Sequence, residues 1–264
     1  MTRYLRLLWV SVRASLATAM AYRLDFIVSG LISLWWMMWT LVPLWVVFGT
    51  GEQKSVAGWS MPEALLVVAW FTALRGLLEG LINPSLIALV DGIRTGTLDF
   101  VLLKPADSQF LVSTRSFVPF KIFDVAAAGV IIAYALHRLG YFPPLANMAV
   151  ALVLLVAAVT VLYAIFILVA CAAFWVVRLD NLAYLFGSIF DAARWPLQVF
   201  RGGWRLVFTF IIPLGVMTTY PAMALLGRLD ASTAWFALAV AAGFATLSRL
   251  AWQRSIGAYT SASS

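Results

Sequence analysis

The sequence predicts an all-α integral membrane protein with six transmembrane helices and an interfacial helix near its N-terminus. Of its 264 residues, 64% are hydrophobic and 11% are charged, whereas a soluble domain usually carries about 25% charged residues. The apolar residues form several continuous runs of about 18 residues or more, the length that crosses a bilayer as a helix. They do not alternate with polar residues as the strands of a membrane β-barrel do. The 12 tryptophans also suit a membrane protein, because tryptophan favours the lipid–water boundary.

The first predicted element is an amphipathic helix over residues 3–22. Basic residues lie on one face and apolar residues recur at helical spacing on another, a pattern typical of a helix that lies at a membrane surface. The basic residues are Arg3, Arg6 and Arg13, and the apolar residues are Leu5, Leu8, Trp9, Val12 and Leu16.

Six apolar stretches follow as predicted spans. The fourth is long for one crossing, so we expect it to be tilted or to extend beyond the bilayer. The stretches cover about residues 26–48, 63–83, 117–136, 146–176, 205–221 and 232–250.

A further element is predicted between the fourth and fifth spans. Residues 178–204 carry arginines and have one apolar face, and we interpret them as a second helix on the cytoplasmic surface. Within this element, residues 182–193, with Asp191 and Arg194, are a weaker candidate for a contact with a cytoplasmic partner.

The distribution of basic residues predicts the orientation. Six spans place both termini on one side of the membrane, and the segments on that side carry most of the 18 Lys and Arg residues. By the positive-inside rule this side is the cytoplasm, which leaves Lys54, Arg138 and Arg228 outside. Nucleic-acid binding is not expected despite the net charge of +7, because the basic residues are spread over several segments instead of one soluble domain.

A polar segment, residues 84–105, interrupts the apolar pattern between the second and third spans. It contains "IRTGTLDFVLLKP", residues 93–105. Gly92 and Gly96 permit tight turns, and Pro105 ends any helix that precedes it. These residues predict either a short, sharply bounded element at the cytoplasmic surface or a plain connecting loop with an interfacial helix. The side chains available for packing are Leu98, Val101 and Leu102.

This segment resembles a signature that follows the second span in ABC-2 type permeases, the membrane subunits of a class of ATP-driven exporters. The sequence has Asp99 where many members have glutamate. The stretches "IIPLGVMTTYPA", residues 211–222, and "YTSASS", residues 259–264, are similar to one bacterial subgroup of these permeases. The residues that carry the signature are Gly96, Thr97, Leu98, Asp99, Leu102, Leu103 and Pro105.

The resemblance implies a specific arrangement of partners. The segment, residues 84–105, would be a coupling element. Its signature residues, together with Ile93 and Arg94 just before them, would dock on an ABC ATPase present in two copies. A second permease would complete the pathway, as a homodimer or as a related heterodimer. The location would be a bacterial cytoplasmic (inner) membrane with both termini inside, and the direction of transport would be export.

Energy must come from another polypeptide, because the chain lacks a G-x-x-x-x-G-K-[ST] phosphate-binding loop. The chain is therefore expected to be no enzyme and to bind no cofactor, with ATP and Mg²⁺ held by the partner ATPase. Its aromatic-rich spans favour an amphiphilic or hydrophobic small molecule as cargo, such as a drug, a natural product, a lipid or a small peptide.

Two charged residues lie inside the predicted second span. Arg75 and Glu79 are four residues apart, so they share a helix face and can pair. Ionisable groups at membrane depth are costly and are candidates for function. The pair either fixes helix packing or lines the transport pathway. Lys121 and Asp124, near the start of the third span, are interpreted as charges at its cytoplasmic edge.

Two other functions remain open from the residues alone. A membrane-embedded enzyme needs converging polar groups, and a zinc site is not expected from the single histidine, His137, and the single cysteine, Cys171. An ion-coupled secondary transporter would use an acidic residue at membrane depth, for which Glu79 is the candidate.

Overall fold

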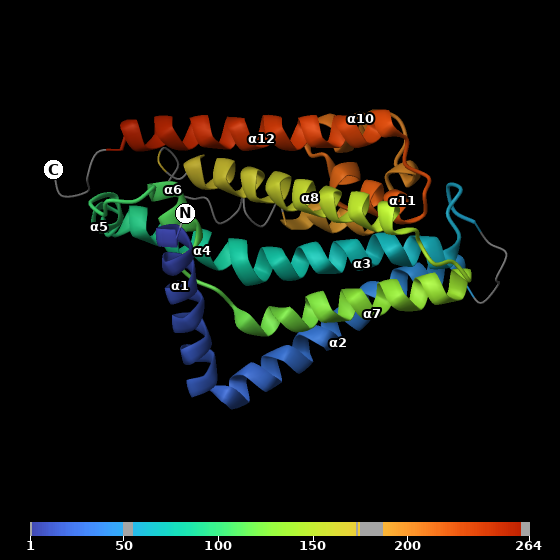
Figure 1. Cartoon of the computed structure of the whole chain (residues 1–264), viewed down its shortest axis with the longest axis horizontal. Coiled ribbons are helices and arrows are strands. Elements are labelled where there is room, and N and C mark those ends of the chain that lie inside the picture. Colours follow the sequence, from blue (N-terminus) through green and yellow to red (C-terminus); the bar gives the residue numbers. More distant parts are fainter. Residues whose placement is uncertain (1, 50–54, 173, 175–186, 260–264) are drawn as a thin grey trace.

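The computed structural model describes residues 2–49, 55–172, 174 and 187–259. Within these residues the chain is helical, and the only β-type pairing is an isolated bridge between Val56 and Trp59. Five helices are long and apolar enough to cross a membrane, and a sixth crossing is reached if one bent pair of helices counts as a single span. This confirms the predicted helical membrane protein. Most of the long helices run roughly along one axis, as a bundle (Figure 1).

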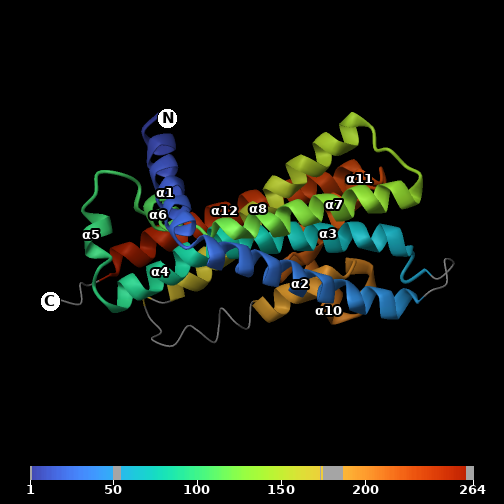
Figure 2. The ribbon, with the colours of Figure 1, turned by 90° about the horizontal axis from the view of Figure 1, so that it is seen from below.

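The first helix lies across this bundle. Helix α1 (Thr2–Ala21) is followed almost immediately by α2 (Arg23–Phe48), and both views show α1 at a steep angle to the long axis of the molecule (Figures 1 and 2). Its apolar side chains include the exposed Leu5 and Trp9. An exposed apolar face on a helix that crosses the bundle axis is the arrangement expected of an interfacial helix.

The second crossing is one long helix, Met61–Arg94, of 34 residues, or about 51 Å at 1.5 Å per residue. It consists of α3 (Met61–Leu77), a π-helical turn η1 (Leu78–Ile82) and α4 (Asn83–Arg94). Pro84 has no N–H to donate to the carbonyl of Gly80. The N–H of Val118 donates to that carbonyl instead, at 2.8 Å, so the break in the helix ladder is used to hold the start of the third crossing.

Short helices connect the second and third crossings at one end of the bundle. They are α5 (Asp99–Leu102) and α6 (Ser108–Ser113). The chain then returns through η2 (Pro119–Lys121) and α7 (Ile122–Leu139), and α8 (Leu145–Ala172) forms the fourth crossing. Helix α3 has the most buried window of the five candidate spans, and it packs against α7.

The predicted fifth span, residues 205–221, is not one continuous helix. The pieces Gly203–Ile211 (α10, Gly203–Leu206, with η5, Val207–Ile211) and Gly215–Leu225 (η6, Gly215–Thr219, with α11, Tyr220–Leu225) meet at an angle of 69°. The break falls at Pro213. The residue before a proline avoids the helical conformation, and Ile212 has φ −123° and ψ 86°.

The predicted surface helix agrees with the structure at residues 187–190, which are helical, but it differs from residue 191 on. Residues 175–186 lie outside the described residues, but residues 191–199 form the short 3₁₀ turns η3 (Asp191–Arg194) and η4 (Leu197–Val199). Ala193 and Leu197 are buried, and Thr218 donates a hydrogen bond of 2.7 Å to the carbonyl of Ala193. This part of the chain packs inside the protein, so the prediction of a surface helix is wrong for these residues.

The last helix, α12 (Ala231–Gly257), runs back along α8. The carboxylate of Asp230 accepts a hydrogen bond of 3.0 Å from the N–H of Thr233 and so caps its first turn. The N-terminal end of α1 and the C-terminal end of α12 lie toward the same end of the molecule as α5 (Figure 1).

Candidate functional site

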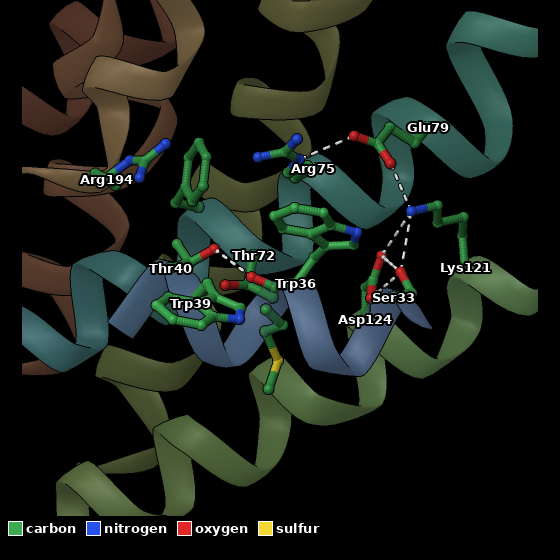
Figure 3. Close-up of a pocket in the computed structure, with 12 residues that line it drawn as sticks. Ser33, Trp36, Trp39, Thr40, Thr72, Arg75, Glu79, Lys121, Asp124 and Arg194 are labelled. Carbon is green, nitrogen blue, oxygen red and sulfur yellow. Dashed lines mark hydrogen bonds and ion pairs between the residues drawn. The ribbon is translucent and has the colours of Figure 1, made fainter. Parts of the chain in front are cut away.

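The two charged residues of the second crossing face each other. Arg75 lies near the end of α3 and Glu79 lies one turn later, in η1. The Nε atom of Arg75 is 2.9 Å from Oε1 of Glu79, and Figure 3 shows the two side chains side by side. Because residues four apart share a helix face, this contact follows directly from their spacing.

Lys121 joins this pair to the third crossing. Its Nζ atom is 2.5 Å from Oε2 of Glu79 and 3.2 Å from Oδ2 of Asp124. Lys121 and Asp124 were interpreted from the sequence as charges at the edge of the membrane, but their side chains are largely buried. Lys121 reaches Glu79 in η1, and Asp124 contacts Lys121 and Ser33 (Figure 3).

Helix α2 contributes a polar side chain to the same group of residues. The hydroxyl of Ser33 donates to the carboxylate of Asp124 at 2.7 Å and accepts a hydrogen bond of 3.0 Å from Nζ of Lys121. Ser33 is itself buried. Three crossings are therefore connected by charge-assisted hydrogen bonds, which are stronger than neutral ones.

The segment before the fifth crossing supplies the remaining charges. Oδ1 of Asp191 lies 3.2 Å from Nη1 of Arg75 and 3.2 Å from Nη2 of Arg194. The guanidinium of Arg194 also lies 5.5 Å from the ring centre of Phe71, within the range of a cation–π contact. Among the described residues, the ion-pair network holds three cations and three carboxylates, namely Arg75, Lys121, Arg194, Glu79, Asp124 and Asp191.

Two glycines allow the network to form. A Cβ atom on Gly76 would lie 3.0 Å from Cβ of Asp124, and a Cβ atom on Gly80 would lie 2.9 Å from Cβ of Lys121. Gly76 and Gly80 are four residues apart, the G-x-x-x-G spacing that lets membrane helices approach closely. The backbone of the second crossing therefore comes close enough to α7 for its charged residues to reach one another.

The network borders a cavity of about 290 Å³ between α2, α3 and α7. Charged, hydroxyl and aromatic side chains line it together (Figure 3). Trp36 and Trp39 are more than half exposed, so the indole rings are at the outside of this chain. No group of three or more His, Cys, Asp or Glu side chains in the described parts of the chain could hold a metal ion. The arrangement offers ionic and apolar contacts to a bound molecule.

Residues 93–105, which the sequence predicts to dock on an ATPase and which we call the coupling segment, lie at the end of the long helix and separate from this network. Gly96 has φ +72°, a left-handed conformation that favours glycine. Gly92, by contrast, lies inside α4, so the predicted turn at Gly92 is wrong. The N–H of Leu98 donates to the carbonyl of Gly92 at 3.1 Å, and the Leu98 side chain is only 1% exposed.

The other residues of the coupling segment are less buried than Leu98. Phe100 and Leu103 are 70% and 80% exposed, so two large apolar side chains project from a tip whose fold does not bury them. Of the other residues predicted to couple, three are exposed and three are partly buried. The exposed residues are Arg94, Thr97 and Pro105, and the partly buried ones are Ile93, Asp99 and Leu102.

Contacts from α6 and α12 hold the end of this segment. Nη2 of Arg249 lies 2.6 Å from Oδ2 of Asp107, and Oδ1 of Asp107 accepts from the N–H of Phe110 at 2.9 Å, which caps α6. Burial raises the pKa of Asp107, but the hydrogen bonds from Arg249 and Phe110 outweigh it and bring the pKa below its ordinary value.

Helix α1 holds the other side of the same region. Nη2 of Arg3 donates to the carbonyl of Pro105 at 2.5 Å, and the ring of Tyr4 packs edge-on against Phe110 with 4.9 Å between ring centres. The coupling segment is therefore held between the first and last helices of the chain.

Sequence reasoning missed part of the ion-pair network. It paired Arg75 with Glu79 but placed Asp191 and Arg194 on the surface, because an apolar face on a polar segment does not reveal what covers it. The G-x-x-x-G spacing of Gly76 and Gly80 was a readable signal for the close approach of two helices.

A family model described as ABC-2 family transporter protein matches residues 16–263, nearly the whole chain. No curated protein and no solved structure matches the chain.

Proposed function

This chain belongs to the ABC-2 transporter family and is a multi-pass membrane permease subunit, and on that premise we propose that it is half of the membrane part of an ATP-driven exporter. In this proposal, residues 93–105 dock on a separate ABC ATPase. Two copies of that ATPase would supply the ATP and Mg²⁺ chemistry, because this chain has no phosphate-binding loop.

The exposed tip of the coupling segment is the observation that carries this proposal. Phe100 and Leu103 are large apolar side chains in water-accessible positions, and such side chains are typical of the buried centre of a protein interface. The buried Leu98 holds them in place. Their position favours a docking element over a plain connecting loop, because a loop without a partner has no use for two apolar side chains at its tip.

The long helix gives a route from the docking element to the membrane. The coupling segment begins in the last two residues of the helix Met61–Arg94 and continues beyond it. The same helix carries Arg75 and Glu79. A displacement of the tip would therefore reach the ion-pair network through one continuous element, as expected of a rigid-body switch. We propose that the network holds α2, α3, α7 and η3 together as one moving body, and that it also lines the cavity.

The pathway itself would require a second permease. The exposed aromatic side chains of α2, which include Trp36 and Trp39, would face that partner across the cavity. Indole rings beside fixed charges suit an amphiphilic cargo, since they offer both apolar and ionic contacts. Homodimer and heterodimer both satisfy this arrangement.

The orientation belongs to the same proposal. The ends of α1 and α12 and the coupling segment lie toward one end of the molecule (Figure 1), and the positive-inside rule assigns that end to the cytoplasm. We propose a bacterial inner membrane with both termini inside.

The test replaces only the exposed side chains. The double variant Phe100→Ser with Leu103→Ser should reach the membrane at a normal level, because neither side chain is part of the core. Copurified ATPase should fall by about tenfold or more, since truncating central apolar contacts commonly costs about 1–2 kcal/mol each. ATP-dependent export should fall with it.

A matched control lies at the opposite end of the bundle. Phe142 and Leu145 are 84% and 82% exposed, and the double variant Phe142→Ser with Leu145→Ser should keep ATPase copurification and export. Normal copurification and export in the Phe100 and Leu103 variant would overturn the docking proposal. Export that continues without ATP and responds to an ion gradient would favour a secondary transporter instead.

A further inference from the structure

A second cavity lies between α1 and the coupling region, on the side of α5 and α6. Its volume is about 400 Å³, which falls in the range of small-molecule sites, about 300–1,000 Å³. We call it the groove. Its apolar lining includes Leu7 and Val10 of α1, Val101 of α5 and Leu111 of α6, together with Phe100, which we also propose as a docking residue. Its charged lining consists of Lys104 and Arg115.

The charges of the groove are not balanced. Lys104 and Arg115 are both exposed, and no carboxylate lines the groove. In the described parts of the chain, Arg115 has only a long contact, 3.5 Å from Nη1 to the carbonyl of Ala88. This differs from the ion-pair network, where each cation faces a carboxylate. Two cations beside an apolar surface favour a ligand that is both anionic and apolar.

The position of the groove indicates where such a ligand comes from. One wall is α1, which crosses the bundle axis (Figure 2) and exposes the apolar side chains Leu5 and Trp9. A helix of this kind lies in the membrane interface. With α1 in that position, the groove would open at the depth where phospholipid phosphates and the first part of their acyl chains are found.

We propose that the groove binds one anionic phospholipid of the cytoplasmic leaflet. Its phosphate contacts Lys104 and Arg115, and the beginning of one acyl chain packs on Leu7, Val10 and Leu111. Anionic lipids attract basic residues close to the membrane surface, and the apolar walls exclude a free phosphate ion as the preferred occupant. An acidic peptide of a protein partner matches the cations but has no chain to place on the walls.

The test uses a photoactivatable phosphatidylglycerol whose reactive group is near the start of one acyl chain. The full-length chain is purified in a neutral detergent without ATPase, exposed to the probe, and the labelled peptides are identified by mass spectrometry. Label is expected on the peptides that contain Leu7–Ser11 and Leu111–Arg115. The same probe built on phosphatidylcholine should label these peptides several-fold less.

Two variants separate charge from shape. Lys104→Gln with Arg115→Gln should reduce groove labelling by on the order of tenfold, because each basic residue contributes to the attraction of an anionic lipid. Val10→Trp should also reduce it, by filling the apolar part without changing the charge. The matched control, Arg23→Gln with Arg254→Gln, removes two other exposed arginines and should leave the labelling unchanged.

Three results would overturn the proposal. They are equal labelling by both probes, labelling of the groove peptides that survives loss of Lys104 and Arg115, and absence of label from these peptides. Since the assay contains no ATPase, a failure of ATPase docking leaves its outcome unchanged. A fourth result needs a separate measurement with added ATPase: weak lipid labelling, together with protection of the groove from chemical modification by the ATPase, would assign the groove to the docking surface and not to a lipid.

Discussion

Helix α2 and the long helix that begins with α3 have the same mean hydropathy, 1.8, over their most apolar windows. Yet 17% of the first window and 78% of the second is buried inside the protein. The first crossing is therefore at the outside of this chain and the second is at its centre. Hydropathy identifies both as spans, but it does not tell what either span faces.

Side-chain size also differs between the two crossings. The second crossing has small residues at Ala69, Ala73, Gly76 and Gly80, and small residues let neighbouring membrane helices approach. The first crossing instead carries large side chains along most of its length. Its exposed tryptophans are Trp35, Trp36, Trp39 and Trp45. Small residues alone do not decide burial, because the alanine-rich helix Ala231–Gly257 also has only 17% of its window buried.

The largest expected effect comes from breaking the charged contact at the buried crossing. Lys121→Met leaves Asp124 without its cation and Glu79 with only Arg75. Removing one partner from a buried pair costs about 3–5 kcal/mol, and we expect about 3 kcal/mol here because Glu79 is partly exposed. The midpoint of thermal unfolding in detergent should fall by roughly 6–12 °C.

An exposed lysine is the control for this change. Lys104→Met should shift the midpoint little, since Lys104 lies at the surface. The second change Asp124→Asn, added to Lys121→Met, should recover part of the loss. A Lys121→Met midpoint equal to that of Lys104→Met would show that the network contributes nothing to stability.

An intermediate effect is expected at the close approach of the two helices. Gly76→Val places a side chain 3.0 Å from Cβ of Asp124, and overpacking of this kind costs about 1–3 kcal/mol. Gly129→Val on α7 has the same change in helix propensity, but a Cβ atom there meets nothing within 4 Å. The difference between the two unfolding midpoints measures packing alone, and equal midpoints would contradict the close contact.

The smallest effect is expected at the exposed crossing. Trp35→Leu on α2 should change the free energy of unfolding by about 0.5 kcal/mol or less, because Trp35 is more than half exposed. Trp70→Leu on α3 should cost more, since Trp70 is buried and the smaller side chain leaves a cavity. Unfolding curves of the two variants in detergent test this order, and equal losses would remove the contrast between the crossings.

The sequence was sufficient for the helical class and for the pairing of Arg75 with Glu79, whereas the position of α1 at the membrane interface stays a prediction. Each rests on local spacing or on a continuous apolar run. The bend at Pro213 also had a local signal, since a proline inside a predicted span marks a possible break. The contact between Lys121 and Glu79 had no local signal in the sequence, because it depends on how far α7 is rotated relative to α3.

The segment with Asp191 and Arg194 was misread for a related reason. A periodic apolar face shows that the face is covered. A single sequence does not tell whether lipid or protein covers it. Here η6 and α3 cover residues 191–199. Tertiary packing therefore determines the position of this segment, and no residue spacing in the sequence reveals that packing.

The equal numbers of cations and carboxylates in the ion-pair network have an electrical consequence. A transmembrane potential does work of about 2.3 kcal/mol per elementary charge for each 100 mV that the charge crosses. The six network side chains, taken with their ordinary charges, sum to zero. If they move together as one body, the voltage across the membrane does almost no net work on them. Such a movement of the network would therefore depend little on the membrane potential.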